Sequence, residues 1–320
     1  MLFWTLGIEY VTVFGIGGKC YNFFAVKYSF DNSEQLEEEI ANYKFVSAYY
    51  KTPKILQKGD AFVEYETIES VVLNKMLDKN CPVSLRLLYK RMLKLTVERT
   101  NPHGGTQLFF VERLGRLSEL PRQVSFEPLI INQRYYPPKV EIMQLVGRLE
   151  HSLSYLSNSL AIPSNGDFHE RNIFSDMTIV DFEGAGLNSV LADSATFIFH
   201  TLFAGTHFGP KYGKWATLKT KTMRLLKRPL RIGRSSITTK LASNRKFLVK
   251  EYVREYLNKL PARDSEDKTK IAELVAFRLA TTLHLKKMAR KDLRAVVSLI
   301  SLFLDKSLSL EQKLDIFTED

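Results

Sequence analysis

The first 65 residues of the chain have the hydrophobic pattern of four strands and one helix. The segment Glu34–Tyr50 places apolar side chains three or four positions apart, on a single helical face: Leu36, Ile40, Tyr43 and Val46. Segments rich in aromatic and β-branched residues flank this helix on both sides: Tyr10–Phe14 and Cys20–Tyr28 before it, Lys54–Leu56 and Ala61–Tyr65 after it. The pattern therefore predicts the order strand, strand, helix, strand, strand.

Beyond residue 66 the pattern is mainly helical. Two segments, Val83–Val97 and Lys139–Leu160, repeat apolar residues at helical intervals, and the same periodicity returns from Phe247 onwards. The segment Tyr135–Pro138 is read as a stiff connector between them, because two consecutive prolines end it. Between residues 163 and 182 the pattern changes to short strand-like pieces joined by polar loops.

These two patterns predict an α+β protein with two lobes. Residues 1–66 form a small antiparallel β lobe, and residues 67–320 form a larger, mainly helical lobe. A chain of 320 residues with 45% hydrophobic and 25% charged residues is long enough to bury a substantial core and has the composition of a folded protein.

Cysteine content and hydropathy favour the cytoplasm. Cys20 and Cys81 are far apart, which excludes a disulfide scaffold and a cysteine zinc site. The apolar start of the chain is interrupted by Glu9 and no basic region precedes it, so we expect no signal peptide. The apolar run Ala295–Leu304 is about half as long as a bilayer crossing requires, and we expect a buried helix there.

The net charge of +11 is concentrated in one part of the chain. Residues 194–250 contain 13 Lys or Arg and no Asp or Glu, and Lys214–Arg228 winds into an amphipathic helix. Residues 211–246 are therefore a candidate contact for an acidic membrane surface or a lipid-linked substrate, at the inner membrane face. The other reading, which we favour, is a solvated basic face. Nucleic acid is disfavoured because no nucleic-acid-binding motif accompanies the charge.

The residues with the clearest chemistry lie in Asn165–Phe174 and in the strand-like piece Ile179–Glu183. Asp167 is followed five positions later by Asn172. Two short strand-like pieces then bring the chain back to Asp181. Phosphoryl transfer needs a carboxylate that accepts the proton of the attacking hydroxyl and oxygen ligands that hold Mg2+ on the nucleotide phosphates. The spacing predicts that these three side chains share one site.

The run N-G-D-F-H-E-R-N-I-F, followed by I-V-D-F-E-G-A-G, resembles the catalytic loop and metal-binding strand of the aminoglycoside phosphotransferase and choline kinase family. The resemblance implies a protein-kinase-like fold and ATP and Mg2+ as cofactors. It also implies that Asp167 is the catalytic base and that Asn172 and Asp181 are magnesium ligands. Asp193 then caps the next helix rather than taking part in the chemistry.

Upstream positions extend the resemblance over roughly residues 10–200. Lys27 matches the strand lysine that contacts nucleotide phosphates. Glu39 matches the helix glutamate that pairs with this lysine. Glu37 and Glu38 lie on the same acidic helix face and are the other candidates for that pairing. The segment Phe62–Glu66, with Glu64, Tyr65 and Glu66, resembles the hinge whose backbone holds adenine.

Two features depart from the family pattern. Asn165 stands where the family usually has a histidine that braces the loop, and because an amide also donates and accepts, we expect an altered brace. Gly15–Gly18 lies too close to Lys27 to be a phosphate-covering loop and is read as a hairpin turn. The covering loop would then lie near Leu6–Gly7. Either Lys27 and metal hold the phosphates, or the start of the chain is truncated.

Three residues of the loop region keep open roles. His169 is either a feature shared with some relatives or a plain loop histidine, and Glu183 could either orient substrate or assist the metal. Arg171 could neutralise charge on the transferred group, but a surface arginine is the better interpretation.

The function predicted from the sequence is an ATP- and Mg2+-dependent phosphotransferase that acts on a hydroxyl of a small molecule, such as an amino alcohol, a sugar or an aminoglycoside. The alternative is a catalytically weak kinase-like binding protein that docks a partner or an acidic membrane through its basic segment. The acceptor itself is not readable from the sequence, since similar loops serve different acceptors.

Overall fold

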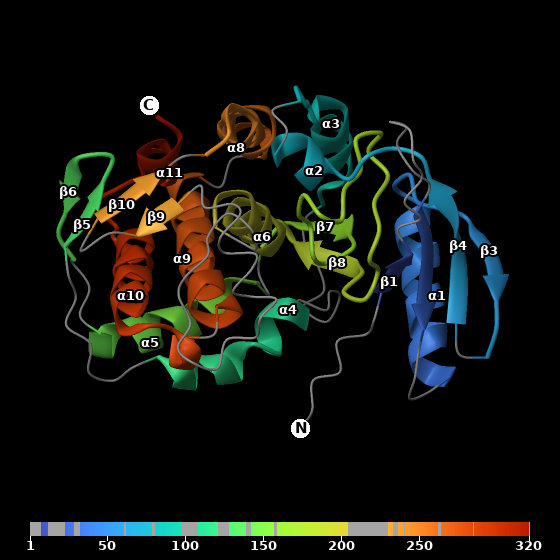
Figure 1. Ribbon diagram of the computed structural model, residues 1–320, viewed down its shortest axis with the longest axis horizontal. Coiled ribbons are helices and arrows are strands. Elements are labelled where there is room, and N and C mark those ends of the chain that lie inside the picture. The colour runs from blue at the N-terminus through green and yellow to red at the C-terminus, as the bar shows by residue number, and fades with distance from the viewer. Residues whose placement is uncertain are drawn as a thin grey trace.

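The molecule consists of a small antiparallel sheet with one helix and a larger, mainly helical part (Figure 1). This arrangement confirms the predicted α+β class, with a small antiparallel β part and a larger, mainly helical part. The computed structural model describes residues 8–11, 23–28, 33–60, 62–78, 81–97, 108–120, 128–138, 142–156, 159–203, 230–232, 236–239, 241–261, 264–283 and 285–319.

The small sheet has four strands in the order β1-β2-β4-β3, and all neighbours are antiparallel. Its elements are β1 (Ile8–Val11), β2 (Phe23–Tyr28), α1 (Ser33–Ser47), β3 (Ile55–Lys58) and β4 (Phe62–Ile68). The predicted order strand, strand, helix, strand, strand is therefore confirmed. Leu36, Ile40 and Val46 are buried on the predicted face of α1, because this face packs against the core.

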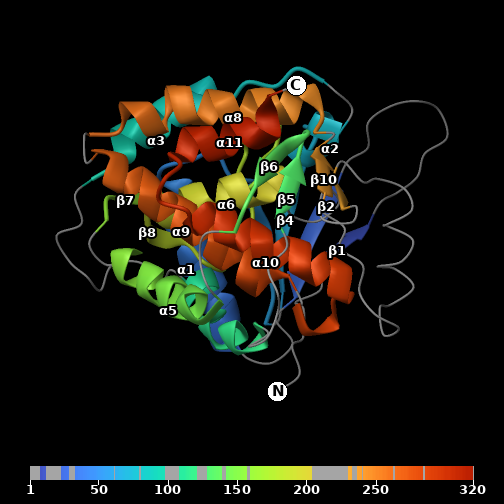
Figure 2. The same ribbon diagram turned by 90° about the vertical axis from the view of Figure 1, so that its left-hand side faces the viewer.

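The larger part is built from helices around a buried central one. Its α-helices within the described residues are α2 (Leu73–Asp78), α3 (Arg86–Leu95), α4 (Leu108–Val111), α5 (Ile142–Ser152), α6 (Val190–Leu202), α8 (Ser243–Glu255), α9 (Asp264–Thr282), α10 (Arg290–Leu304) and α11 (Leu310–Thr318). Short 3-10 turns add η1 (Leu114–Glu119), η2 (Leu153–Leu156), η3 (Leu257–Lys259) and η4 (Leu285–Lys287). Every residue of α6 is buried, since α6 lies amid the other helices and packs on α8 and α9 (Figure 2).

A second four-stranded sheet lies at the end of the helical part that is remote from the small sheet (Figure 1). Its order is β6-β5-β10-β9, with β5 (Leu129–Ile131), β6 (Arg134–Tyr136), β9 (Leu230–Ile232) and β10 (Ser236–Thr239). The connector interpretation of Tyr135–Pro138 is wrong for Tyr135 and Tyr136, which pair with Ile130 and Leu129. Strands of three residues carry too little periodicity to be recognised, and β5 pairs in parallel with the distant β10.

A two-stranded sheet, β7 (Ala161–Ser164) and β8 (Gly186–Ser189), carries the predicted catalytic loop between its strands. The helix predicted over 139–160 ends earlier, at Ser152, and the chain continues as a 3-10 turn and then as β7. The expected buried helix at 295–304 is the second half of α10. The predicted helix at 214–228 and the glycine segment at 15–18 lie outside the described residues.

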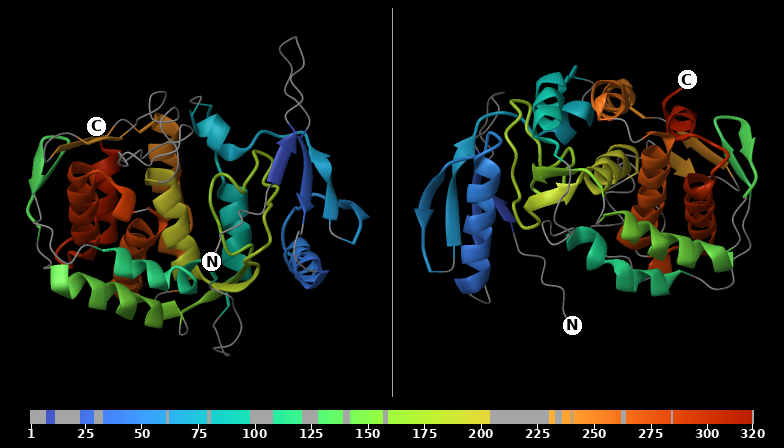
Figure 3. Two further views of the ribbon diagram at one scale, coloured as in Figure 1. Left: turned by 60° about the horizontal axis from the view of Figure 1, so that its bottom comes forward. Right: turned by 180° about the vertical axis from the view of Figure 1, so that it is seen from behind.

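The chain passes from the small sheet to the helical part after Ile68, the last residue of β4. Views from below and from behind show the small sheet and α1 on one side and the helices on the other (Figure 3). Hydrogen bonds cross this boundary: the Tyr50 hydroxyl donates to the Pro163 carbonyl at 2.8 Å, and the Lys51 ammonium donates to the Asp176 carboxylate at 2.5 Å. None of the described helices has the length and apolar character that crossing a membrane demands.

Candidate active site

The loop after β7 begins with a glycine that no other residue can replace without strain. Gly166 has φ +77°, and a Cβ at this position would lie 1.9 Å from the carbonyl oxygen of Gly184. Glycine is required for both reasons, because it tolerates positive φ and leaves room for the close approach. The loop is thereby pressed against the segment that follows Asp181.

A short hairpin returns the chain from Asn172 to Asp181. The Val180 amide donates to the Asn172 carbonyl at 3.0 Å, and Ile173 forms a β-bridge with Ile179. The side-chain amide of Asn165 donates to the Val180 carbonyl at 2.9 Å. Asn165 is buried and thus braces the loop against the returning strand, as expected for an asparagine at this position.

Asp167, Asn172 and Asp181 are brought together by this hairpin. The Asn172 side-chain nitrogen lies 3.1 Å from the Asp167 carbonyl oxygen and 3.4 Å from Asp181 Oδ2. Asp181 has φ +66°, a conformation that is uncommon outside glycine and clusters at functional sites. The three predicted residues therefore share one site, while their individual roles remain predictions.

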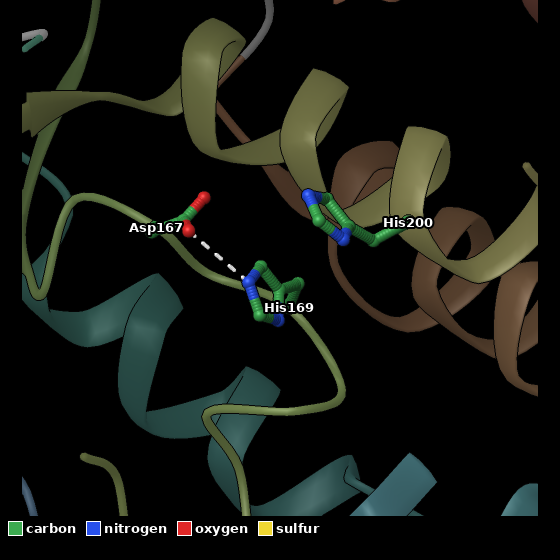
Figure 4. Close-up of side chains that lie close together, drawn as sticks. All are labelled: Asp167, His169 and His200. Carbon is green, nitrogen blue, oxygen red and sulfur yellow. Dashed lines mark hydrogen bonds and ion pairs between the residues drawn. The ribbon is translucent and has the colours of Figure 1, made fainter. Parts of the chain in front are cut away.

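The carboxylate of Asp167 is hydrogen-bonded on both oxygens. His169 Nε2 lies 3.1 Å from Oδ2 (Figure 4), and Arg278 Nη2 of α9 lies 3.4 Å from Oδ1. The His169 Nδ1 accepts the Arg171 amide at 3.1 Å, so Nε2 carries the proton that is donated to Asp167. Burial acts to raise the pKa of Asp167, but the interactions of its carboxylate with His169 and Arg278 outweigh it and hold this pKa below its usual range. Asp167 is therefore an ionised hydrogen-bond acceptor.

His200 of α6 completes a cluster with Asp167 and His169. Its ring stacks on that of His169 with centroids 4.0 Å apart (Figure 4), and burial lowers the pKa of His200 well below its usual value. Two histidines and a carboxylate resemble a metal-ligand set. However, Arg278 Nη2 lies 3.1 Å from His200 Nε2 as well as near Asp167, and a buried guanidinium at this point repels a metal cation. The cluster is better described as a hydrogen-bonded support for Asp167.

Asn172 and Asp181 have the donor chemistry that magnesium prefers. Both offer a hard oxygen ligand, an amide oxygen and a carboxylate. The end of the Asn172 amide that faces the Asp167 carbonyl and Asp181 Oδ2 is its nitrogen. The two residues therefore fit a magnesium ion in the type of their donor atoms, and joint binding of the ion would require the Asn172 amide to turn its oxygen towards Asp181.

The predicted helix glutamate is buried beneath the small sheet. Glu39 is 7% exposed and accepts the Tyr65 hydroxyl at 3.4 Å, whereas Glu37 and Glu38 are exposed. Lys27 lies in β2, paired with Val63 of β4, and its side chain is outside the described part of the chain. Glu39 is thus the one of the three glutamates that faces the core, and its pairing with Lys27 remains a prediction.

Phe182 connects the site to the small sheet and α1. Its ring is buried and packs edge-on against Tyr43 of α1 at 5.3 Å, and it contacts Tyr65 of β4 at 6.1 Å. Because Phe182 follows Asp181 directly, the position of Asp181 depends on the packing of α1 against β4.

The predicted hinge is placed differently by the structure. Glu64, Tyr65 and Glu66 lie inside β4, between β2 and β3, where Glu64 pairs with Val26 on one side and Gln57 on the other. The Glu66 amide donates to the Lys54 carbonyl at 2.7 Å, so sheet pairing occupies the backbone that was expected to hold adenine. The interpretation of residues 64–66 as the hinge is therefore corrected: the connection follows Ile68.

The structure also places three further residues that the sequence singled out. Ser189, not Asp193, caps α6: its hydroxyl accepts the Leu191 amide at 3.2 Å, and Asp193 lies buried in the first turn. Arg171 is half-buried beside the loop, and Glu183 is exposed, with its carbonyl accepting from Asn42 at 3.4 Å.

Sequence reasoning missed Arg278 and His200, which reach Asp167 from α9 and α6. Arg278 is fully buried, with its guanidinium between the rings of Phe110 and Phe199 at 5.5 Å and 5.6 Å. A single charged residue within the apolar run 274–280 was the available signal, because such a residue is seldom buried without a partner.

Comparison with known proteins gives low overall similarity. No protein-family model matches the chain, and no curated protein matches its sequence. Among solved structures, a complex of gentamicin with APH(2")-IIa is 10% identical, with a TM-score of 0.41, and covers 91% of this chain and 89% of its own. Choline kinase from Cryptosporidium parvum Iowa II is 12% identical with a TM-score of 0.41, covering 92% of this chain and 85% of its own. An aminoglycoside phosphotransferase from Alicyclobacillus acidocaldarius is 11% identical with a TM-score of 0.39, covering 92% and 87%.

Proposed function

We propose that this protein is an ATP- and Mg2+-dependent phosphotransferase that moves the terminal phosphoryl group of ATP to a hydroxyl of a small molecule. The observation that carries the proposal is the convergence of Asp167, Asn172 and Asp181 through hydrogen bonds of 3.1 Å and 3.4 Å at Asn172. Phosphoryl transfer requires one ionised acceptor beside a pair of oxygen ligands, which is the set that these residues provide.

In the proposed reaction Asp167 accepts a hydrogen bond from the acceptor hydroxyl and aligns its oxygen with the terminal phosphorus. A bond forms between this oxygen and phosphorus while the bond from phosphorus to the bridging oxygen of ADP breaks. The hydroxyl proton passes to Asp167 and then to solvent. Asn172 and Asp181 would hold magnesium, which when bound neutralises charge on the nucleotide phosphates.

The nucleotide is proposed to lie between the small sheet and the helical part. Lys27 of β2 would contact its phosphates, with Glu39 as the partner of this lysine. The backbone that follows Ile68 would hold adenine, in place of residues 64–66. An ATP-dependent reaction and a chain with two cysteines both fit the cytoplasm.

The test is an ATP-consumption screen over amino alcohols, sugars and aminoglycosides, with magnesium-dependent ATP binding measured in parallel. Replacing Asp167 by Asn should lower acceptor-stimulated turnover by about a thousandfold and leave ATP binding intact, because general-base catalysis contributes at that order. Glu150→Gln, at an exposed position of α5, is the control. Absence of both turnover and metal-dependent nucleotide binding would exclude the proposal, and binding without turnover would support a kinase-like binding protein instead.

A further inference from the structure

A charged side chain of the predicted catalytic loop lies in the interior of the helical part. Glu170 and Arg171 are the central residues of a tight turn, which the Asn172 amide closes by donating to the His169 carbonyl at 3.0 Å. Residues of turns and loops normally lie at the surface, and glutamate is almost never fully buried unless it is paired. Glu170 is nevertheless 0% exposed. Its carboxylate therefore needs a partner inside the molecule.

The partner of Glu170 is Arg245, near the start of α8. Arg245 Nη1 lies 3.3 Å from Glu170 Oε1, and both side chains are buried. Among the described residues Glu170 Oε2 has no hydrogen-bond partner, so this carboxylate depends on Arg245. Buried ion pairs seldom add net stability, because desolvation of the two charges offsets their attraction, but loss of one partner leaves the other buried and uncompensated. The pair is thus better suited to fixing one conformation than to stabilising the fold.

Arg245 also links the turn to two further helices. Its Nη2 donates to the side-chain oxygen of Asn74 in α2 at 2.6 Å, and its Nη1 donates to the carbonyl of Thr201 in the last turn of α6 at 3.3 Å. The backbone makes a parallel link, since the Asn74 amide donates to the Glu170 carbonyl at 2.9 Å. Residues of α2, α6 and α8 therefore converge on a single turn of the loop.

The turn held in this way lies between two residues of the proposed site. Asp167 comes three positions before Glu170, and Asn172 comes two positions after it. The Asn172 side-chain nitrogen lies 3.1 Å from the Asp167 carbonyl oxygen and 3.4 Å from Asp181 Oδ2, so a shift of the turn would move Asn172 relative to both. Groups behind the ligands of a metal orient those ligands, and their loss commonly lowers metal affinity ten- to hundredfold.

We propose that Glu170 and Arg245 are positioning residues that hold Asn172 in place relative to Asp167 and Asp181, and thereby set the affinity of the site for nucleotide-bound magnesium. The inference rests on the proposed phosphotransferase function. The two side chains act through the backbone of the turn, because both are buried.

The test measures binding of a non-hydrolysable ATP analogue, AMP-PNP, to the full-length protein by calorimetric titration, in EDTA and with Mg2+. Glu170→Gln keeps the size of the side chain and removes its charge. The affinity in EDTA should stay unchanged, whereas the increase in affinity that Mg2+ gives should fall about tenfold, because Asn172 is displaced while the rest of the nucleotide site is kept. Arg245→Lys keeps the charge but loses the forked donor geometry, and should lose part of this increase.

A milder variant and a matched control separate positioning from folding. Asn74→Ala removes one acceptor of Arg245 and leaves the ion pair intact, so it should reduce the Mg2+-dependent increase to a smaller extent. Glu251→Gln is the control, since Glu251 is a buried carboxylate of the same helix that accepts the Ser84 hydroxyl at 2.6 Å and does not contact the loop. This control should be less stable in urea than the wild type but should keep the full Mg2+-dependent increase.

Hydrogen exchange measured by mass spectrometry reports on the loop itself. The amides of residues 165–174 should exchange faster in Glu170→Gln than in the wild type, whereas Glu251→Gln should leave them unchanged. A structural role confined to overall stability would change the exchange of this loop equally in the two variants.

The outcomes separate this inference from the function on which it rests. If folded Glu170→Gln keeps the full Mg2+-dependent increase, or if Glu251→Gln loses as much of it, the inference is wrong while the phosphotransferase proposal still stands. Where Glu170→Gln does not fold, Asn74→Ala decides in its place by the same criterion. Absence of Mg2+-dependent binding in the wild type would overturn both proposals.

Discussion

Individual side chains around Asp167 differ in how burial and charge set their ionisation. Asp193 lies 2% exposed in the first turn of α6, and its Oδ2 has no hydrogen-bond partner in the described part of the chain. Burial and the nearby charge of Asp167 raise the pKa of Asp193 to about 7, while a hydrogen bond with Ser164 acts in the opposite direction. Asp193 therefore exchanges its proton near neutral pH, although it lies beneath the site rather than in it.

Replacing Asp193 by Asn should raise the free energy of unfolding at pH 8. The folded-state pKa lies above the ordinary value of 3.8, so the native protein holds more protons than the unfolded chain between pH 4 and 7. Wild-type stability should fall as the pH rises over that interval, by up to about 1.4 kcal/mol per pH unit, and the Asp193→Asn substitution removes this slope. Urea unfolding at pH 5, 6, 7 and 8 measures the difference, which should shrink towards pH 5.

The control for this effect is a carboxylate whose pKa is shifted in the opposite direction. Hydrogen bonds from Lys51 and Ser70 outweigh partial burial and lower the pKa of Asp176 to about 2. This residue stabilises the fold at pH values above 3.8, and the contribution is lost as the pH falls towards 2, so Asp176→Asn should destabilise the protein at pH 8. If Asp193→Asn and Asp176→Asn change the stability in the same direction at pH 8, the assignment for Asp193 is wrong.

At the level of elements, the loop after β7 and the segment before β8 lie so close together that the contact leaves no room for a side chain at Gly166. Gly166→Ala should destabilise the protein by about 1–3 kcal/mol, because its positive φ and the contact with the Gly184 carbonyl cannot both be kept. Turnover should fall by more than the loss of folded protein explains, since the displaced loop carries Asp167. Urea unfolding and ATP consumption of the same preparation measure both effects.

The matched substitution is Gly147→Ala in the middle of α5. A Cβ there meets no atom within 4 Å, and the residue has no positive φ, so Ala should stabilise the helix by about 0.5–1 kcal/mol. Equal effects of the two substitutions would contradict the close approach at Gly166.

Elements whose stability is decided locally could be predicted from the sequence. The helix α1 and the strands β2, β3 and β4 follow from apolar spacing, and Asp167, Asn172 and Asp181 are close in sequence and joined by a single hairpin. The pairing of β5 with β10 and the contact between Arg278 and Asp167 join segments about 100 residues apart, which no local pattern encodes. The hinge was misplaced because β4 extends beyond the residues whose alternation was read as strand.

At the scale of the whole molecule, the site depends on how the small sheet meets the helical part. Phe182 packs on Tyr43 and Tyr65, and the Tyr50 hydroxyl bonds the Pro163 carbonyl just before the catalytic loop. A nucleotide bound between the two parts would add contacts to both, and any ligand that binds only the native state stabilises it.

Mg2+ and ATP together should therefore raise the unfolding temperature. At a nucleotide concentration near 100 times its dissociation constant the gain is about 2.7 kcal/mol, which corresponds to roughly 4 °C in a chain of this size. Asp181→Asn should abolish the magnesium-dependent part of this gain, because one metal-binding carboxylate is lost while asparagine tolerates the φ of +66° at this position. Calorimetric melting with ATP in EDTA, ATP with Mg2+ and Mg2+ alone separates the two contributions, and Glu37→Gln at an exposed position of α1 is the control. A gain of the same size in wild type and in Asp181→Asn would mean that the carboxylate of Asp181 does not hold the nucleotide-bound metal.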